Sequence, residues 1–151
     1  MGDILTPPKR SQLMARIRSK NTKPELLIRK GLHRMGFRYV LHDRRLVGKP
    51  DLVLPKWNAV IFIHGCFWHG HDCDLYRLPK TATDFWEAKV AANRIRDQHC
   101  VDALRGTGWR VLTIWECALK GKRNLGLDSI LVRAAEWVRS DRSADEIRGG
   151  K

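Results

Sequence analysis

No stretch of this chain approaches the roughly 18 apolar residues that a membrane span needs, and its N-terminus lacks the apolar core of a secretory signal. Internal repeats and low-complexity tracts are missing too. We therefore expect an intracellular protein of one globular domain, whose 151 residues can bury a core without staples. In a reducing compartment, its four cysteines indicate metal ligands or free thiols, not a disulfide framework.

Acidic residues are scarce relative to basic ones. The chain has 16 Asp and Glu against 29 Lys and Arg, a formal net charge of +13, and its first 50 residues hold 13 basic and 3 acidic side chains. One interpretation is a solvated, soluble surface. A one-sided excess of this size favours the other interpretation, a surface that binds a polyanion, with nucleic acid as the first candidate.

The hydrophobic pattern predicts an α/β fold in the order helix, three strands, helix, strand, helix around a mixed sheet. The expected helices cover about 23–35, 83–105 and 128–139, and the expected strands cover about 37–41, 51–55, 57–63 and 109–115. The first helix should bury Leu26, Leu27, Leu32 and Met35. The predicted parts of the chain are a basic N-terminal arm over 1–20, the main domain over 21–140, and a flexible, frayed tail over 141–151.

The stretch IFIHGCFWHGHDC, residues 61–73, places cysteines, histidines and large aromatics directly behind an apolar run. Cys66, His71 and Cys73 follow a Cys-x₄-His-x-Cys spacing, and Cys117 ends the last predicted strand, so neighbouring strand ends can bring the four together. Such a Cys₃His set closes a tetrahedral zinc site and leaves no position for substrate, which indicates a structural role. The alternative is that these cysteines are small buried apolar residues.

Asp51 begins a short predicted strand after Gly-Lys-Pro, a common placement for a magnesium ligand in nucleases. A metal-dependent nuclease needs a cation that polarises the phosphate and a group that deprotonates water. His69, which the zinc set leaves free, can take the second role because an imidazole titrates near neutral pH. The alternatives are a turn or cap role for Asp51, and a structural or zinc-binding role for His69.

Phe67 and Trp68 lie on the same loop as the zinc set, and Trp86 lies near the start of the following helix. In a basic protein, flat side chains on a tethered loop can wedge between base pairs, which costs least at a mismatch. Met14 on the basic arm can wedge from the opposite side. The alternative is core packing, which we expect for the other tryptophans, Trp57, Trp109, Trp115 and Trp137.

Together these segments closely resemble the very-short-patch-repair (Vsr) DNA mismatch endonucleases, a branch of the PD-(D/E)XK nuclease superfamily. The resemblance covers about residues 9–139 and implies a single-domain αβββαβα, restriction-endonuclease-like core with a structural zinc site. It is carried, in order, by MARIRSKNTKPE (14–25), PDLVLP (50–55), VIFIHGCFWHGHDC (60–73), FWEAKV (85–90) and GWRVLTIWECAL (108–119).

The resemblance also implies roles for individual residues. Asp51 corresponds to the Mg²⁺-binding carboxylate, His69 to the general base and Glu25 to an acidic residue that holds metal-bound water, while His64 is a further catalytic candidate. Ile63 departs from the family's usual threonine: if this position serves the Mg²⁺ through its main-chain carbonyl, activity survives, and if the hydroxyl matters, metal affinity or rate should fall. The implied zinc ligands are Cys66, His71, Cys73 and Cys117. The DNA-binding candidates are Met14, Phe67, Trp68 and Trp86, with Arg16 and Lys20 on the basic arm.

We therefore expect a Mg²⁺-dependent, zinc-stabilised endonuclease. It would nick one strand of double-stranded DNA 5′ to the thymine of a T:G mispair, the product of 5-methylcytosine deamination, and start very short patch repair. We expect a cytoplasmic, nucleoid-associated monomer, with mismatch-repair and repair-polymerase proteins as candidate partners. Two rivals stay open: a restriction-type endonuclease that cuts both strands, and a non-catalytic zinc DNA-binding protein.

Overall fold

The computed structural model describes residues 22–150, which form a mixed α/β fold. The basic arm, and with it Met14, Arg16 and Lys20, lies outside the described residues. Within the described part, one five-stranded sheet has the order β1-β2-β3-β4-β5. Its first two pairings are antiparallel and its last two are parallel. The strands are β1 (Val40–Leu41), β2 (Leu52–Leu54), β3 (Ala59–His64), β4 (Arg110–Trp115) and β5 (Ala144–Ile147).

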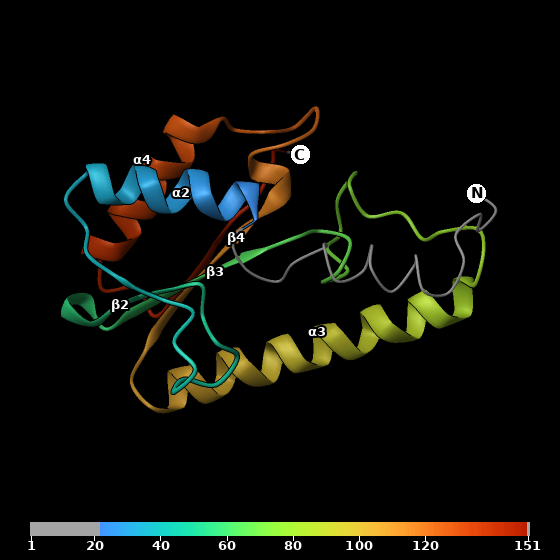
Figure 1. Ribbon diagram of the computed structural model, residues 1–151, viewed down its shortest axis with the longest axis horizontal. Coiled ribbons are helices and arrows are strands. Elements are labelled where there is room, and N and C mark those ends of the chain that lie inside the picture. The colour runs from blue at the N-terminus through green and yellow to red at the C-terminus, as the bar shows by residue number, and fades with distance from the viewer. Residues whose placement is uncertain (1–21, 151) are drawn as a thin grey trace.

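Three α-helices of the described residues cover the two faces of the sheet: α2 (Lys23–Arg34), α3 (Thr83–Gly106) and α4 (Leu127–Arg139). Helices α2 and α4 lie together on one face, and the long α3 runs along the other and extends beyond the sheet (Figure 1). The observed order matches the predicted one, with β5 added. Within residues 22–150, we find no helix with the length and apolar character of a membrane span.

The alternation of side chains along β3 builds a hydrophobic core on each face of the sheet. Ala59 and Ile61 belong to the larger core, which lies under α2 and α4, whereas Val60 and Phe62 belong to the smaller core under α3. All four are buried, and β3 pairs with β2 on one side and β4 on the other. β3 is therefore a central strand that is covered on both faces of the sheet.

The buried side of α2 differs from the predicted one. Leu26 and Leu27 are only partly buried, and Met35 is exposed. The helix instead approaches α4 through Gly31, where a Cβ would lie 2.4 Å from a methyl carbon of Leu131. Glycine allows this close approach, so the buried face is centred on that contact. The buried residues of α2 are Glu25, Ile28, Gly31 and Leu32.

The polar tail is part of the sheet, so the prediction of a flexible end is wrong for this segment. Ala144–Ile147 form β5, which pairs in parallel with β4, and Ile147 is buried. Beyond it, Arg148 forms an ion pair with Asp72 at 2.7 Å and joins the tail to the loop after β3. The sequence does not reveal this strand because three of its four side chains are exposed and no alternating apolar pattern marks it.

Candidate metal and catalytic centres

The four candidate zinc ligands come together between the loop after β3 and the end of β4. The ligand atoms of Cys66, His71, Cys73 and Cys117 all lie within 4.8 Å of one another. His71 Nδ1 is 3.6 Å from Cys66 Sγ and 3.5 Å from Cys117 Sγ. Tetrahedral zinc, with bonds of about 2.3 Å to sulfur and about 2.0 Å to nitrogen, separates two such ligands by about 3.5 Å. The donor types and their spacing therefore fit a metal ion of the zinc type.

Neighbouring groups support this cluster. The N–H of Cys117 donates to Cys66 Sγ, and the N–H of Gly149 donates to Cys117 Sγ, each at 3.3 Å. Burial raises the pKa of both thiols, so they ionise readily only beside a cation. Burial lowers the pKa of His71, whose ring stacks on Trp115 with the centroids 3.9 Å apart. The imidazole is therefore neutral at pH 7, the form that binds metal.

A second group lies on the α2 side of the sheet, where Glu25 of α2 meets Asp51 directly before β2. Asp51 accepts a hydrogen bond from the N–H of Ile63 on β3 at 2.7 Å. Glu25 accepts one from Arg29 at 2.7 Å and lies 2.9 Å from His42 Nε2. The ligand atoms of Glu25, His42 and Asp51 lie within 4.8 Å of one another, so this group too can hold a metal ion.

The electrostatics of this acidic pair favour a cation. Asp51 is 6% exposed, and burial, reinforced by Glu25, raises its pKa to about 8 although the hydrogen bond from Ile63 acts in the other direction. Two buried carboxylates repel each other when both are ionised, and a divalent cation removes that repulsion. Ile63 reaches the pair through its main chain, so its contact with Asp51 does not depend on the side chain.

A third group lies on the α3 side of β3. His64 and His69 stack face to face, with the ring centroids 3.7 Å apart and the planes 3° apart. His69 Nδ1 is 2.5 Å from a carboxylate oxygen of Asp97 on α3. Because Asp97 holds Nδ1, Nε2 is the ring atom of His69 that can accept a proton. Burial lowers the pKa of His64 well below its ordinary value, and electrostatic repulsion from His69 lowers it further. His64 therefore stays neutral.

The three candidate intercalating aromatics form one cluster near the N-terminal end of α3. Phe67, Trp68 and Trp86 contact each other, with ring centroids 5.2 to 5.7 Å apart. Phe85 extends the cluster through Trp86 and is 59% exposed. Phe67, Trp68 and Trp86 are each partly buried and belong to neither hydrophobic core. Core packing therefore does not account for them.

The other tryptophans divide differently from the prediction. Trp137 is buried in the larger core, and Trp57 and Trp109 pack against the two cores, as predicted. Trp115 was also predicted to be core, and this is wrong. Its ring stacks on His71 and meets the edge of His64. Trp115 thus separates the candidate zinc cluster from the candidate catalytic histidines.

Sequence reasoning missed two partners of the site, His42 on Glu25 and Asp97 on His69. Trp86 and Asp97 are eleven residues, or about three helical turns, apart on one face of α3. That spacing is the signal from which Asp97 could have been found. For His42 the sequence holds no comparable signal, because its contact with Glu25 joins a loop to a helix. The remaining cysteine, Cys100, is buried on α3 and lies outside all three groups.

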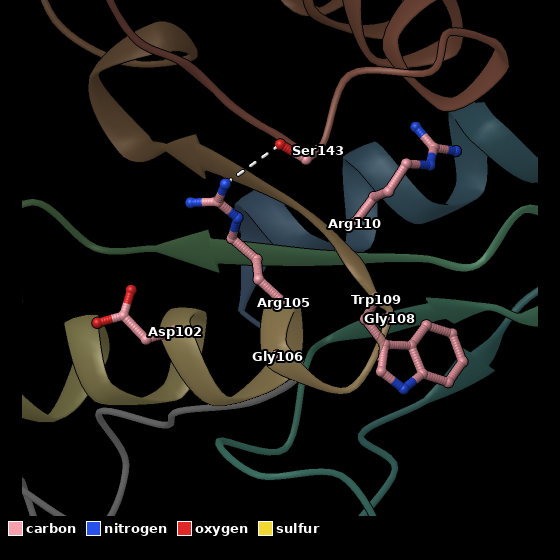
Figure 2. A pocket seen from close by; sticks show the side chains of 7 residues that line it. All are labelled: Asp102, Arg105, Gly106, Gly108, Trp109, Arg110 and Ser143. Carbon is pink, nitrogen blue, oxygen red and sulfur yellow. Dashed lines mark hydrogen bonds between the residues drawn. The ribbon is translucent and has the colours of Figure 1, made fainter.

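A hollow of about 460 Å³ lies at the other end of the sheet, between the end of α3 and the start of β4 (Figure 2). Arg110 points away from α3 and donates hydrogen bonds to the backbone carbonyls of Trp57, Trp137 and Val138. Arg105 donates to Ser143 Oγ at 3.3 Å. These contacts are structural, and the hollow shares no residue with the three groups. Its lining residues are Asp102, Arg105, Gly106, Gly108, Trp109, Arg110 and Ser143.

Ile63 and His64, consecutive on β3, connect the acidic pair on one side of the strand with the histidines on the other. A buried carboxylate pair that can hold a metal ion, and a histidine held by its own carboxylate, are components that a metal-dependent hydrolase uses. The fold and the described groups therefore define the class: an α/β protein with a buried acidic group and a separate Cys₃His group, each of which can hold a metal ion.

Comparison with known proteins gives the particular family. The family described as "DNA mismatch endonuclease Vsr" matches residues 2–75. The chain is 37% identical over 147 residues to the DNA mismatch endonuclease Vsr of Escherichia coli (strain K12), covering 97% of this chain and 94% of the relative. It is 52% identical over 122 residues to the type II nicking enzyme V.NmeAIP of Neisseria meningitidis, covering 81% and 87%. The chain belongs to the Vsr family of DNA mismatch endonucleases, as the resemblance implied.

Proposed function

We propose that this protein is a Mg²⁺-dependent, zinc-stabilised endonuclease that nicks one DNA strand 5′ to the thymine of a T:G mispair and so starts very short patch repair. The observation that carries the proposal is the buried Glu25–Asp51 pair, which the consecutive β3 residues Ile63 and His64 connect to the His69–Asp97 pair. Relatives named as a mismatch endonuclease and as a nicking enzyme support it. The element order also supports a restriction-endonuclease-like core.

The Glu25–Asp51 pocket is the proposed Mg²⁺ site. Asp51, Glu25 and the main chain of Ile63 would hold the ion, and oxygen ligands of this type suit Mg²⁺. When bound, Mg²⁺ polarises the scissile phosphate and stabilises the charge that develops on it. Arg29 and His42 hold the Glu25 carboxylate in place from two directions.

His69 is the proposed general base. Its Nε2 accepts the proton that the attacking water gives up, and the Asp97 carboxylate at Nδ1 stabilises the imidazolium that forms. His64 stacks on the ring and fixes its plane. His64 stays neutral at pH 7, so it adds no charge that would oppose protonation of His69.

The zinc ion is the proposed scaffold of the same loop. Cys66, His71 and Cys73 would bind it from the loop and Cys117 from the element that follows β4, which fixes both ends of the segment that carries Phe67, Trp68 and His69. With the loop fixed, Phe67 and Trp68 can insert into DNA together with Trp86 as a preformed wedge. A mismatched step unstacks at the lowest cost, which gives selectivity for the T:G site.

The basic N-terminal third would bind the phosphates. Arg16 and Lys20 are proposed to contact the DNA backbone, and Met14 to enter the DNA from the groove opposite the aromatic cluster. Binding should therefore weaken steeply with salt. We further propose that the enzyme acts as a monomer in the cytoplasm, and that mismatch-repair and repair-polymerase proteins use its nicked product.

Asp51→Asn tests the proposal, because it keeps the shape and the acceptor for the Ile63 N–H but removes the charge that would hold Mg²⁺. We expect nicking of a T:G duplex to fall below detection, while zinc content and binding of the duplex in Mg²⁺-free buffer stay unchanged. Asp102→Asn is the matched control, because Asp102 is exposed at the other end of α3. Undiminished nicking by the Asp51 variant would remove the carboxylate from the mechanism.

The same assay separates the two rivals. A restriction-type enzyme cuts both strands of a fully paired duplex, and a non-catalytic zinc protein binds DNA but cuts neither strand. Labelling the two strands of paired and T:G duplexes differently distinguishes all three behaviours.

A further inference from the structure

One face of α3 holds the backbone of the loop after β3 on both sides of His69. Asn93 donates a side-chain hydrogen bond to the carbonyl of Trp68 at 2.8 Å. Arg94 donates two hydrogen bonds to the carbonyl of Gly70, from Nε at 2.9 Å and from Nη2 at 2.6 Å. The residues immediately before and after His69 are thus tied to the helix that also carries Asp97.

The contact at Gly70 leaves the loop no room to shift toward α3. Gly70 has φ +59°, and a Cβ there would lie 2.5 Å from a methyl carbon of Val90 and 2.6 Å from Arg94 Nε. Val90 is itself buried, so the loop lies directly on the helix surface. The glycine is required at this position both for its backbone conformation and for the close approach.

We propose that Asn93 and Arg94 are positioning residues: they fix the carbonyl groups of the two residues that flank His69, Trp68 and Gly70, and so place its imidazole for proton transfer. The inference rests on the proposed function, because it assumes that His69 is the general base. A zinc ion held by the Cys₃His group would fix the ends of the loop at Cys66 and His71, whereas the three residues Trp68 to Gly70 are held by α3 side chains. Asp97 contacts one atom of the His69 ring, and this contact does not fix the backbone that carries the ring.

The same helix also carries Trp86, which contacts Phe67 and Trp68. Asn93 therefore links the candidate wedge to the candidate base through a single peptide, at the carbonyl of Trp68. Insertion of Trp68 into a mismatch and placement of His69 become one event, because the two side chains are attached to adjacent residues of a segment that α3 holds rigid. A misplacement of about 1 Å at a reacting group can cost on the order of 10²-fold in rate.

The test is steady-state nicking of a T:G duplex by the zinc-loaded, full-length protein. Arg94→Ala removes the grip on Gly70, and Asn93→Asp keeps the shape of the side chain but removes the donor. Both variants should lower kcat by about 10- to 100-fold. For Arg94→Ala, KM should stay at the wild-type value, whereas Asn93→Asp should also raise KM, because it frees Trp68. Zinc content and Tm should stay close to wild type in both.

Arg96→Ala is the matched control, since Arg96 is a neighbouring cation on α3 that is exposed. It loses the same charge and should keep full kcat. The inference is overturned if Arg94→Ala and Asn93→Asp keep wild-type kcat, if Arg96→Ala loses as much, or if the loss follows zinc release. If the wild-type protein itself does not nick the T:G duplex, the proposed function fails. If the wild type, Arg96→Ala, Arg94→Ala and Asn93→Asp all nick at the same rate, only the positioning role fails.

Discussion

The raised pKa of Asp51 makes the free energy of unfolding depend on pH in a way that one substitution can isolate. Burial beside Glu25 raises this pKa to about 8, while the same group in the unfolded chain ionises near its ordinary value of about 4. Below about pH 4, both states hold the proton and pH has no effect. Between about pH 4 and pH 8, the folded state keeps a proton that the unfolded state has lost, so stability falls as pH rises.

The expected magnitude follows from one proton. Each pH unit in that window lowers the free energy of unfolding by about 1.36 kcal/mol, so Asp51 alone removes about 2.7 kcal/mol between pH 5 and pH 7. This slope requires only that the folded pKa lie above the window. Asp51→Asn has no such proton. Between pH 5 and pH 7, the free energy of unfolding of the wild type should therefore fall by about 2.7 kcal/mol more than that of Asp51→Asn. Saturating Mg²⁺ should also remove the difference, because a cation keeps the carboxylate ionised.

Urea unfolding of zinc-loaded protein in Mg²⁺-free buffer, at several pH values from 5 to 7, measures this difference. Titrating groups that do not interact with Asp51 are common to both proteins and cancel in the comparison. Parallel stability–pH curves for the wild type and Asp51→Asn would refute the reasoning, because they would show that Asp51 is already ionised in its folded environment.

Three further predictions test separate parts of the site. Cys66→Ser should release the zinc and lower Tm by roughly 10 °C, measured by metal analysis and calorimetry; a full zinc equivalent in the variant would mean that the ligands are wrong. Gly149→Ala should destabilise by about 1–3 kcal/mol, because its Cβ would lie 2.6 Å from the Cys117 carbonyl oxygen, whereas Gly150→Ala, with its nearest atom at 3.8 Å, should unfold like the wild type. Asp97→Asn should lower kcat by about 10²- to 10⁴-fold without changing the affinity for DNA, and equal loss in Asp102→Asn would contradict this.

The parts of the site that the sequence predicted are those that local patterns determine. The Cys-x₄-His-x-Cys spacing lies within one short loop, so Cys66, His71 and Cys73 were recognisable as a set before their geometry was known. Cys117 was predicted because it follows a strand, and parallel strands end at the same edge of a sheet. The helix–strand order likewise followed from hydrophobic periodicity.

The parts that the sequence did not reveal depend on contacts between distant segments. Asp97 is one of many polar residues on a largely exposed helix, and only the placement of α3 beside the loop gives it His69 as a partner. Strand β5 exists because β4 offers a free edge, not because its own residues are apolar. Trp115 could be expected in the core from its strand, yet the two histidines that flank it decide its environment.

The central claim is that the protein nicks one strand at a T:G mispair, and a strand-resolved nicking assay tests it most directly. A duplex with one T:G mispair, labelled differently on its two strands, is incubated with zinc-loaded protein and Mg²⁺ beside its fully paired counterpart. We predict a single cut, 5′ to the mispaired thymine, with the guanine strand and the paired duplex intact. Cleavage of both strands, or equal cleavage of the paired duplex, would contradict the account.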